Sequence, residues 1–299
     1  DSISSIKKKT KLFFFDDLIK LILSKKIKKF ENNYRTNIFD SNKSFFTLFT
    51  SGSTGQPKGI CHNIGGYLTY SLYTSKYHFG MNSKSVILTA SDAGWINGHT
   101  YALFTPLLLG AETILVEDPF LLLDEKFLHK IIKERKVSIL YLPVTIIRIM
   151  RSMFNYRKNK NFFLKTIGSM GEHLAKDVGD WYSKYFKNRN KSIINTYFQT
   201  ETGGILFSPK FNEKINKSPN GSVGSIVKNI HYDSLEIKQK KEILVKSPFP
   251  GLMKKVINSQ KEHRKYFDKN GNFRLFDLAT KIRNAVYVHG RIDDVINVR

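Results

Sequence analysis

One glycine-rich run of the sequence carries residue types suited to binding phosphate. Residues 50–59 are Thr-Ser-Gly-Ser-Thr-Gly-Gln-Pro-Lys-Gly, and they directly follow a short apolar segment, FFTLFT, at 45–50. Small hydroxyl residues and three glycines leave the backbone N–H groups exposed, and such groups can surround phosphate oxygens. Ser51, Ser53, Thr54 and Lys58 add side-chain donors. The run is not a Walker loop, in which Gly precedes the Lys and Ser or Thr follows it.

The elements that must position this loop alternate between strand and helix. Apolar runs predict strands at 45–50, 85–90, 113–117, 138–142, 166–169 and 192–197. Between them, helices are expected to begin near residue 62 and to cover 98–109, 124–135, 143–153 and 175–186. This alternation predicts an α/β fold in which helices connect parallel strands.

The pattern changes after residue 204. Short apolar runs at 223–227, 235–237 and 242–246 are separated by Pro, Gly, Asn and Lys, which predicts a small antiparallel or β-barrel-like unit. We therefore expect four parts along the chain, with a charged, partly helical entry segment over 1–35. The parts are a sheet unit with the phosphate loop at 1–80, a second αβ unit at 81–205, the barrel-like unit at 206–290 and a truncated hinge strand at 291–299.

The chain is strongly basic, with 49 Lys and Arg against 25 Asp and Glu and a net charge of +24. Such a charge could attract nucleic acid. Most of the cations are lysines, however, and the chain is rich in Asn, Ile and Phe, a mixture that an A/T-biased coding sequence produces without any binding role. No zinc-finger spacing or RNP-like signature is present in the sequence, so we expect no specific nucleic-acid partner.

Cysteine and hydrophobic content limit the class of protein further. The single cysteine, Cys61, excludes an internal disulfide framework and a multi-cysteine metal site, and we expect it to be structural. The most apolar N-terminal stretch, 12–23, is interrupted by charges and is too short to cross a bilayer. We therefore expect no membrane partner and a cytoplasmic location, with an organelle matrix as the alternative. The first residue is Asp1 rather than Met, which predicts that the sequence begins within a longer protein.

Several stretches resemble, in order, the motifs of the adenylate-forming superfamily of acyl-CoA synthetases, luciferases and peptide-synthetase adenylation domains. Within it, the resemblance is to short-chain acyl-CoA synthetases of the acetyl-CoA synthetase kind. It implies the parallel-sheet αβα subdomains of the large N-terminal domain, the first of them incomplete, followed by a small β-barrel-like subdomain and without the C-terminal domain. The stretches are the loop at 50–59, DAGWINGHTY at 92–101, PLLLGA at 106–111, GSMGE at 168–172, NTYFQTETGG at 195–204 and GRIDDVIN at 290–297.

The resemblance implies an AMP-forming ligase. A carboxylate attacks the α-phosphate of ATP to give acyl-AMP and pyrophosphate, and the thiol of CoA then displaces AMP. The implied ligands are ATP, Mg²⁺, CoA and a small acid, acetate or propionate. Because two anions must meet, the site needs positioned cations and N–H donors more than a general base. Catalytic roles are implied for Lys58, Thr200, Glu201 and Arg291, with Glu201 as the magnesium ligand.

The implied nucleotide site extends beyond these four residues. Asp277 would accept hydrogen bonds from the ribose hydroxyls, Tyr197 could stack on the adenine, and Asp293 resembles the hinge about which a C-terminal domain swings. The expected ATP- and AMP-binding residues are Thr50, Ser51, Gly52, Ser53, Thr54, Gly55, Gly171, Glu172, His173, Asn195, Thr196, Tyr197, Phe198, Gln199 and Asp277.

The acyl pocket is expected to be lined by Trp95, Ile96, Asn97, Met170 and Phe198. In acetate enzymes a Trp stands at the position of Phe198, and Met170 replaces a smaller residue, which would refill the space. Because one methylene changes binding by only about 1–3 kcal/mol, the residues indicate a small carboxylate and leave acetate and propionate both open. His62 and His99 are interpreted as packing or hydrogen-bonding groups.

Three features depart from the family pattern. The usual Thr-Gly-Asp before the ribose carboxylate is Leu275-Phe276-Asp277 here, His173 stands where Pro is usual, and the sequence ends at Arg299, just after the hinge. The family's C-terminal domain, with its adenylation lysine, is therefore absent from this sequence. We expect these residues to bind nucleotide but to complete thioester formation poorly. Two alternatives stay open: a ligase with another acceptor, such as a carrier-protein thiol or a sugar amine, and a decayed nucleotide-binding homologue.

Overall fold

In a computed structural model of the chain, the structure describes residues 36–50, 57–116, 118–154, 163–186, 191–231, 240–257 and 259–292. The chain divides into two units, Asp1–Phe39 and Asp40–Arg299, and the second contains the described helices and strands. Loop residues 51–55, the expected entry helix, the run 235–237 and the hinge residue Asp293 lie outside the described residues. No helix in the described ranges is both long and apolar enough to cross a membrane.

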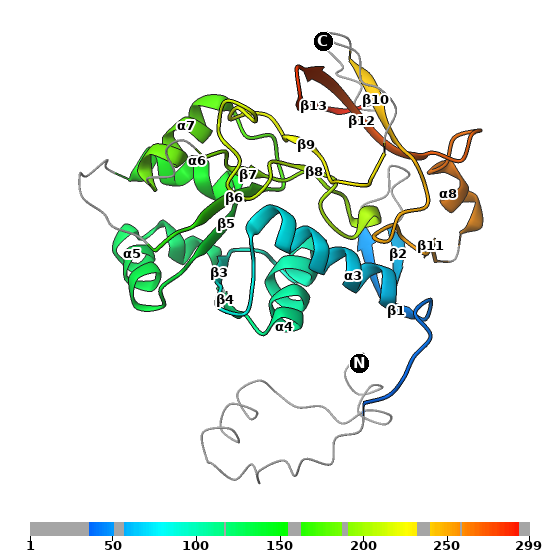
Figure 1. Ribbon diagram of the computed structural model, residues 1–299, viewed down its shortest axis with the longest axis horizontal. Helices are drawn as coiled ribbons and strands as arrows, with labels where there is room; N and C mark the ends of the chain where they lie inside the picture. Colours follow the sequence, from blue (N-terminus) through cyan, green and yellow to red (C-terminus); the bar gives the residue numbers. More distant parts are fainter. Residues whose placement is uncertain are drawn as a thin grey trace, which may run out of the picture. The chain divides into compact units, whose positions relative to one another are not determined.

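A five-stranded parallel sheet forms the centre of this unit (Figure 1). Its order is β4-β3-β5-β6-β7, and every neighbouring pair is parallel. Strands covered on both faces are expected to be continuously apolar, which is why these runs were visible in the sequence. The predicted α/β fold is confirmed. The strands are β3 (Val86–Thr89), β4 (Glu112–Leu115), β5 (Ile139–Pro143), β6 (Thr166–Met170) and β7 (Ile194–Asn195).

Helices cover both faces of this sheet. Successive residues of a strand point to opposite faces, so Leu88 and Leu140 join one core cluster while Ile87 and Ile139 join the other. The first cluster takes in α5 (Glu125–Glu134), α6 (Val144–Met153) and α7 (Lys176–Tyr185). The second takes in α3 (Ile64–Thr74) and the π-helical turns η1 (Ser75–Phe79) and η2 (Gly98–Phe104), which α4 (Thr105–Leu109) follows.

A second sheet contains the strand expected at 45–50 and corrects one expectation. β1 (Ser44–Thr50) pairs antiparallel with β2 (Lys58–Asn63), and β11 (Lys255–Val256) pairs with the other edge of β2. The prediction that the 45–50 strand belongs to the parallel alternation was wrong, because the short connection to β2 cannot make the crossover of a dozen or more residues that parallel strands need. The helix expected near residue 62 begins at Ile64, where the Asn63 side chain caps it.

The C-terminal part is built from short antiparallel strands. β10 (Lys241–Val245), β12 (Phe273–Ile282) and β13 (Ala285–Arg291) form one sheet in the order β10-β12-β13, and β8 (Phe207–Ser208) pairs with β9 (Ser225–Ile226). In the described ranges these strands form open sheets and no closed barrel. Three short helices complete the fold: η3 (Pro119–Leu123), η4 (Thr200–Thr202) and α8 (Gln260–Lys265). The part boundaries at 80, 205 and 290 stay predictions.

Two buried histidines make the stability depend on pH. Burial lowers the pKa of both His62 and His78 from 6.5 to about 4. Between these values the unfolded chain binds protons that the folded chain does not, so the folded state loses stability as the pH falls. We expect the free energy of unfolding to fall by about 1.4 kcal/mol per pH unit for each histidine across this window.

Urea unfolding at pH about 7 and about 5 measures this loss. The His62 Nε2–Thr200 O and His78 Nδ1–Pro209 O distances are both 2.7 Å, so His62→Gln and His78→Asn retain a donor at the same place. Each variant should reduce the dependence of the unfolding free energy on pH by the contribution of one histidine, about 1.4 kcal/mol per pH unit. A slope unchanged from that of the wild type would contradict the prediction.

Candidate functional site

The carboxyl ends of the central strands open into a single large cleft. Its volume is about 1600 Å³. Ligands of open α/β sheets bind at this edge, because the loops that follow the strands converge there. Ala90 follows β3, Pro143 ends β5, Gly171 follows β6 and Thr196 follows β7. The residues expected at the site that line the cleft are Thr50, Lys58, Trp95, Ile96, Asn97, Met170, Gly171, Glu172, His173, Thr196, Tyr197, Phe198, Gln199, Thr200, Glu201, Asp277 and Arg291.

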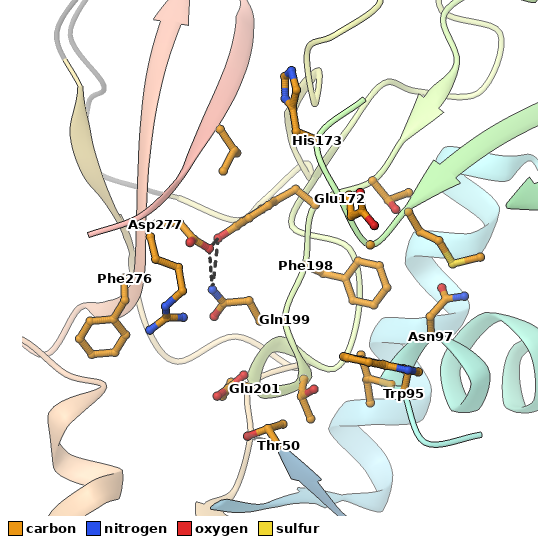
Figure 2. Close-up of a pocket in the computed structure, with 18 of the residues that line it drawn as sticks. Thr50, Trp95, Asn97, Glu172, His173, Phe198, Gln199, Glu201, Phe276 and Asp277 are labelled. Carbon is orange, nitrogen blue, oxygen red and sulfur yellow. Dashed lines mark hydrogen bonds between the residues drawn. The ribbon is translucent and has the colours of Figure 1, made fainter. Parts of the chain in front are cut away.

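Asp277 lies at the centre of a hydrogen-bond network that joins β12 to the segment after β7. The Tyr197 hydroxyl donates to Asp277 Oδ2 at 2.5 Å, and Gln199 Nε2 donates to the same oxygen at 2.8 Å. Gln199 Nε2 also donates to the Leu275 carbonyl oxygen at 2.7 Å. Burial and the neighbouring Asp277 carboxylate raise the pKa of Tyr197 well above its usual value, so the phenol stays protonated and donates. Figure 2 shows the link between Gln199 and Asp277 inside the cleft.

Glu201 is a buried carboxylate held from two directions. It lies in the turn η4, and the Tyr266 hydroxyl donates to Glu201 Oε1 at 2.7 Å. From behind, His62 Nε2 lies 2.7 Å from the carbonyl oxygen of the preceding residue, Thr200. This fits the expected hydrogen-bonding role of His62. The turn that presents Glu201 is therefore fixed to β2 on one side and to the residue after α8 on the other.

Lys58 enters the cleft from the start of β2, opposite α8. Its ammonium lies 3.4 Å from Glu262 Oε2 and 5.6 Å from the centre of the Tyr266 ring. Glu262 also pairs with Lys265, which lines the cleft as well. The part of the cleft beside α8 therefore carries two lysine ammonium groups, both of which are paired with Glu262.

The expected acyl-pocket residues lie together on one side of the cleft. Figure 2 shows Trp95, Asn97 and Phe198 there, with Asp277 and Phe276 on the opposite side. Ile96, Asn97 and Met170 are almost fully buried, whereas 70% of Trp95 is exposed. The Phe198 ring packs edge-on against the Tyr101 ring, with 5.6 Å between the ring centres.

The residues expected near the adenine differ in exposure: Glu172 lies at the surface, whereas Asn195 is buried. Glu172 is exposed and pairs with Arg148, and its Oε1 accepts from the Thr145 hydroxyl at 2.5 Å. Asn195 does not line the cleft, because its amide is buried behind it. Asn195 Oδ1 accepts from the Ser169 hydroxyl at 3.0 Å, and Nδ2 donates to the Ser222 carbonyl oxygen at 2.9 Å.

Comparison with known families places this cleft in context. The profile of the family described as "AMP-binding enzyme" matches residues 5–254. This chain belongs to the AMP-binding enzyme family. The chain spans about two fifths of the length of the curated relatives that it matches.

Sequence relatives of this AMP-binding chain come from fungi and bacteria. Acetyl-coenzyme A synthetase 2 of Eremothecium gossypii is 34% identical over 265 residues, which are 85% of this chain and 39% of that protein. Acetyl-coenzyme A synthetase 2 of Saccharomyces cerevisiae is 34% identical over 87% of this chain and 40% of its own length. Acetyl-coenzyme A synthetase of Vibrio parahaemolyticus is 33% identical over 85% and 41%.

A solved structure shares the fold. The benzoate CoA ligase from Burkholderia xenovorans LB400 superposes with a TM-score of 0.72 and 18% sequence identity, covering 87% of this chain and 51% of that one. The expected superfamily resemblance and fold are thus confirmed.

Glu201 fits the magnesium site that this family resemblance implies. Within the described ranges, no group of three or more His, Cys, Asp or Glu side chains is placed to hold a metal ion. Mg²⁺ is commonly bound through one or two carboxylates together with phosphate oxygens and water. A buried carboxylate that accepts one hydrogen bond from a phenol and lines the same cleft as Lys58 offers that kind of incomplete site.

Sequence reasoning missed Tyr266, which lines the cleft of this AMP-binding chain and bonds to Glu201. It also missed Arg274, whose guanidinium donates to both carboxylate oxygens of Glu242. The available signal was the aromatic spacing of Tyr266, Phe267 and Phe273, whose rings pack together in the structure. Core aromatics give the same signal, so it did not mark a site.

Phe276 occupies the position at which the family pattern has glycine, and the structure shows what this substitution requires. The φ angle of Phe276 is 56°, in the left-handed region that glycine adopts most readily. The turn arises because the register between β10 and β12 jumps from Glu242–Leu278 to Leu244–Arg274, which leaves extra residues on β12. The Arg274 guanidinium lies 4.8 Å from the centre of the Phe276 ring, and the Tyr266 ring packs edge-on against the same ring. These two contacts stabilise the Phe276 side chain in its position.

We expect Phe276→Gly to be more stable than Phe276→Ala by about 1 kcal/mol, the reverse of the usual order. Both variants lose the ring contacts, but only alanine keeps the cost of a left-handed backbone, which is about 1–2 kcal/mol. Urea unfolding of the two variants measures the difference. Val288, in the extended strand β13, is the control position: there Val288→Ala should be more stable than Val288→Gly. The prediction fails if alanine is favoured at both positions.

Proposed function

We propose that this chain forms the nucleotide- and acyl-binding part of an AMP-forming acyl-CoA synthetase for a small carboxylic acid. The observation that carries the proposal is the content of the cleft. Residues from five of the six motif stretches, together with Asp277, line one cavity at the carboxyl edge of the sheet, whereas residues 106–111 contribute nothing to its lining. Each stretch was expected at such a site from its own motif.

In the proposed complex, Asp277 holds the ribose. Tyr197 and Gln199 both donate to Oδ2 of Asp277, which fixes the plane of the carboxylate and directs its other oxygen. A fixed carboxylate suits two neighbouring hydroxyl donors. The adenine would lie toward Gly171 and Tyr197, whose phenol is anchored by the same carboxylate.

The phosphates would lie toward Thr50, Lys58 and Glu201. Lys58 and Lys265 supply positive charge, and Arg291 lines the same cleft. When bound, magnesium would be held by Glu201 and would neutralise phosphate charge. Thr200 would donate to the α-phosphate. The chain's own contribution to the first step is positioning, because it brings the acid beside the α-phosphate among fixed donors.

The acid would enter between Trp95, Met170 and Phe198. The buried walls there are mainly apolar, which fits a short acyl group, and we propose acetate or propionate as the size class. CoA is the proposed acceptor, in keeping with the names of the acetyl-coenzyme A synthetase relatives.

A thermal-shift titration tests the proposal. Magnesium-ATP and the ethyl, propyl and butyl esters of AMP are added to the chain separately. A ligand that binds only the folded state raises the melting temperature in a saturable way. We expect a rise with ATP and with the esters, largest at one short chain length. A chain shown to be folded by circular dichroism that responds to none of them would contradict the proposal and support a decayed homologue.

A further inference from the structure

Asn97 has an unmet requirement for hydrogen bonds. Only 6% of the residue is exposed, and neither Oδ1 nor Nδ2 has a hydrogen-bond partner. Asn97 takes part in none of the side-chain hydrogen bonds found in the described ranges, although nearby the backbone carbonyl oxygen of Trp95 accepts one from the His99 ring. A buried amide usually satisfies most of its donors and acceptors, so an amide with none satisfied needs a partner that is not part of the protein.

The position of Asn97 distinguishes it from other unsatisfied groups. Several buried polar atoms lack partners in the part of the chain that the structure describes, among them Thr105 Oγ1 and Thr89 Oγ1. Asn97 is the one side chain of that set that lines the cleft, and the one whose oxygen and nitrogen both lack a partner. Figure 2 shows it beside Trp95 and Phe198, on the side assigned to the acyl group.

The surroundings of Asn97 define which chemical group could satisfy it. Ile96 and Met170 are buried and apolar, and Trp95 and Phe198 complete the same side of the cleft. A second carboxylate would leave an unpaired charge against apolar walls, which is costly. A hydroxyl is neutral, accepts from Nδ2 and donates to Oδ1, so it matches both atoms of the amide.

We propose that the acid activated at this site carries a hydroxyl group on its short acyl chain, and that Asn97 recognises this hydroxyl. The inference rests on the proposed function and narrows its substrate class from small carboxylates to small hydroxy acids. A site built to hydrogen-bond a hydroxyl discriminates strongly against an analogue that lacks it, because its buried polar group is then left unpaired.

The test compares three AMP esters of equal charge by isothermal titration calorimetry: propyl, 2-hydroxypropyl and 3-hydroxypropyl. We expect one hydroxypropyl ester to bind at least about tenfold more tightly than the propyl ester. Asn97→Leu, which is similar in size and has no polar atoms, should remove this preference and leave the propyl ester bound at least as tightly. Thr105→Val removes an unpartnered buried hydroxyl that does not line the cleft, and it should leave the preference unchanged.

Each result separates the two proposals. If the propyl ester binds as well as or better than both hydroxypropyl esters, the hydroxy-acid inference is wrong while the adenylate site stands. If Asn97→Leu weakens all three esters equally, Asn97 serves an internal water or the fold, and the inference is again wrong. If no ester and no ATP binds to the folded chain, the proposed function itself fails. Circular dichroism melting of both variants confirms that they fold.

Discussion

Replacing Glu201 by glutamine is expected to weaken the binding of magnesium-ATP by about 10- to 100-fold, the loss typical of a disturbed metal site. The amide keeps the size of the side chain, and its oxygen can still accept from the Tyr266 hydroxyl, which lies 2.7 Å from Glu201 Oε1. The fold should therefore survive. The negative charge that we propose attracts the cation is lost, and a neutral amide is a weaker ligand for Mg²⁺.

The propyl ester of AMP serves as the internal comparison, because its binding requires no metal. Its affinity should change by less than about threefold in Glu201→Gln, since only the metal-dependent part is removed. Calorimetric titrations with magnesium-ATP and with the ester, each repeated in EDTA, measure both numbers. Glu213→Gln is the matched control, because Glu213 bonds to Lys210 and Ser218 outside the cleft. Equal losses for both ligands would assign Glu201 a structural role instead.

The sheet could be predicted because its signal is local. β3 and β5 are largely buried and almost wholly apolar, as expected for strands covered on both faces. β6 is buried throughout but mixes apolar residues with Thr166 and Ser169, so its signal was weaker. β2 gave no such signal, since it holds Lys58, Gly59 and His62 within six residues. Its strand conformation depends on pairing with β1 and β11, and neither pairing is encoded in the residues of β2 themselves.

The candidate site likewise contains residues that local sequence motifs indicate and residues that only the folded packing reveals. Residues within motifs, such as Thr200 and Glu201, were expected at the site because the run at 195–204 resembles a family motif, and both line the cleft. Tyr266 reaches Glu201 across 65 positions of the sequence, and no motif marks it. The left-handed backbone of Phe276 runs against the preference of its residue type, so only the register jump in β12 explains it. The unsatisfied amide of Asn97 is likewise a property of packing and not of sequence.

Asp277→Asn is expected to weaken the binding of AMP and ATP by about 10- to 100-fold. The amide oxygen of the substituted side chain can still accept from Tyr197 and Gln199, which now meet at Oδ2 of Asp277. The remaining position then carries an NH₂ group, which cannot accept from a ribose hydroxyl. Hydrogen bonds to a charged acceptor contribute about 1.5–3 kcal/mol, and this sets the size of the loss.

The decisive measurement for Asp277 is a thermodynamic cycle that combines the Asp277→Asn substitution with removal of the ribose hydroxyls from the ligand. If the carboxylate holds the ribose, 2′,3′-dideoxy-AMP should bind the wild type as weakly as AMP binds Asp277→Asn. The two changes should not add when combined, because each removes the same interaction. Inorganic pyrophosphate, which has no ribose, should bind both proteins equally. Additive losses would show that Asp277 acts only through Tyr197 and Gln199, by keeping β12 joined to the segment after β7, and the ribose contact would then have to be sought at another residue of the cleft.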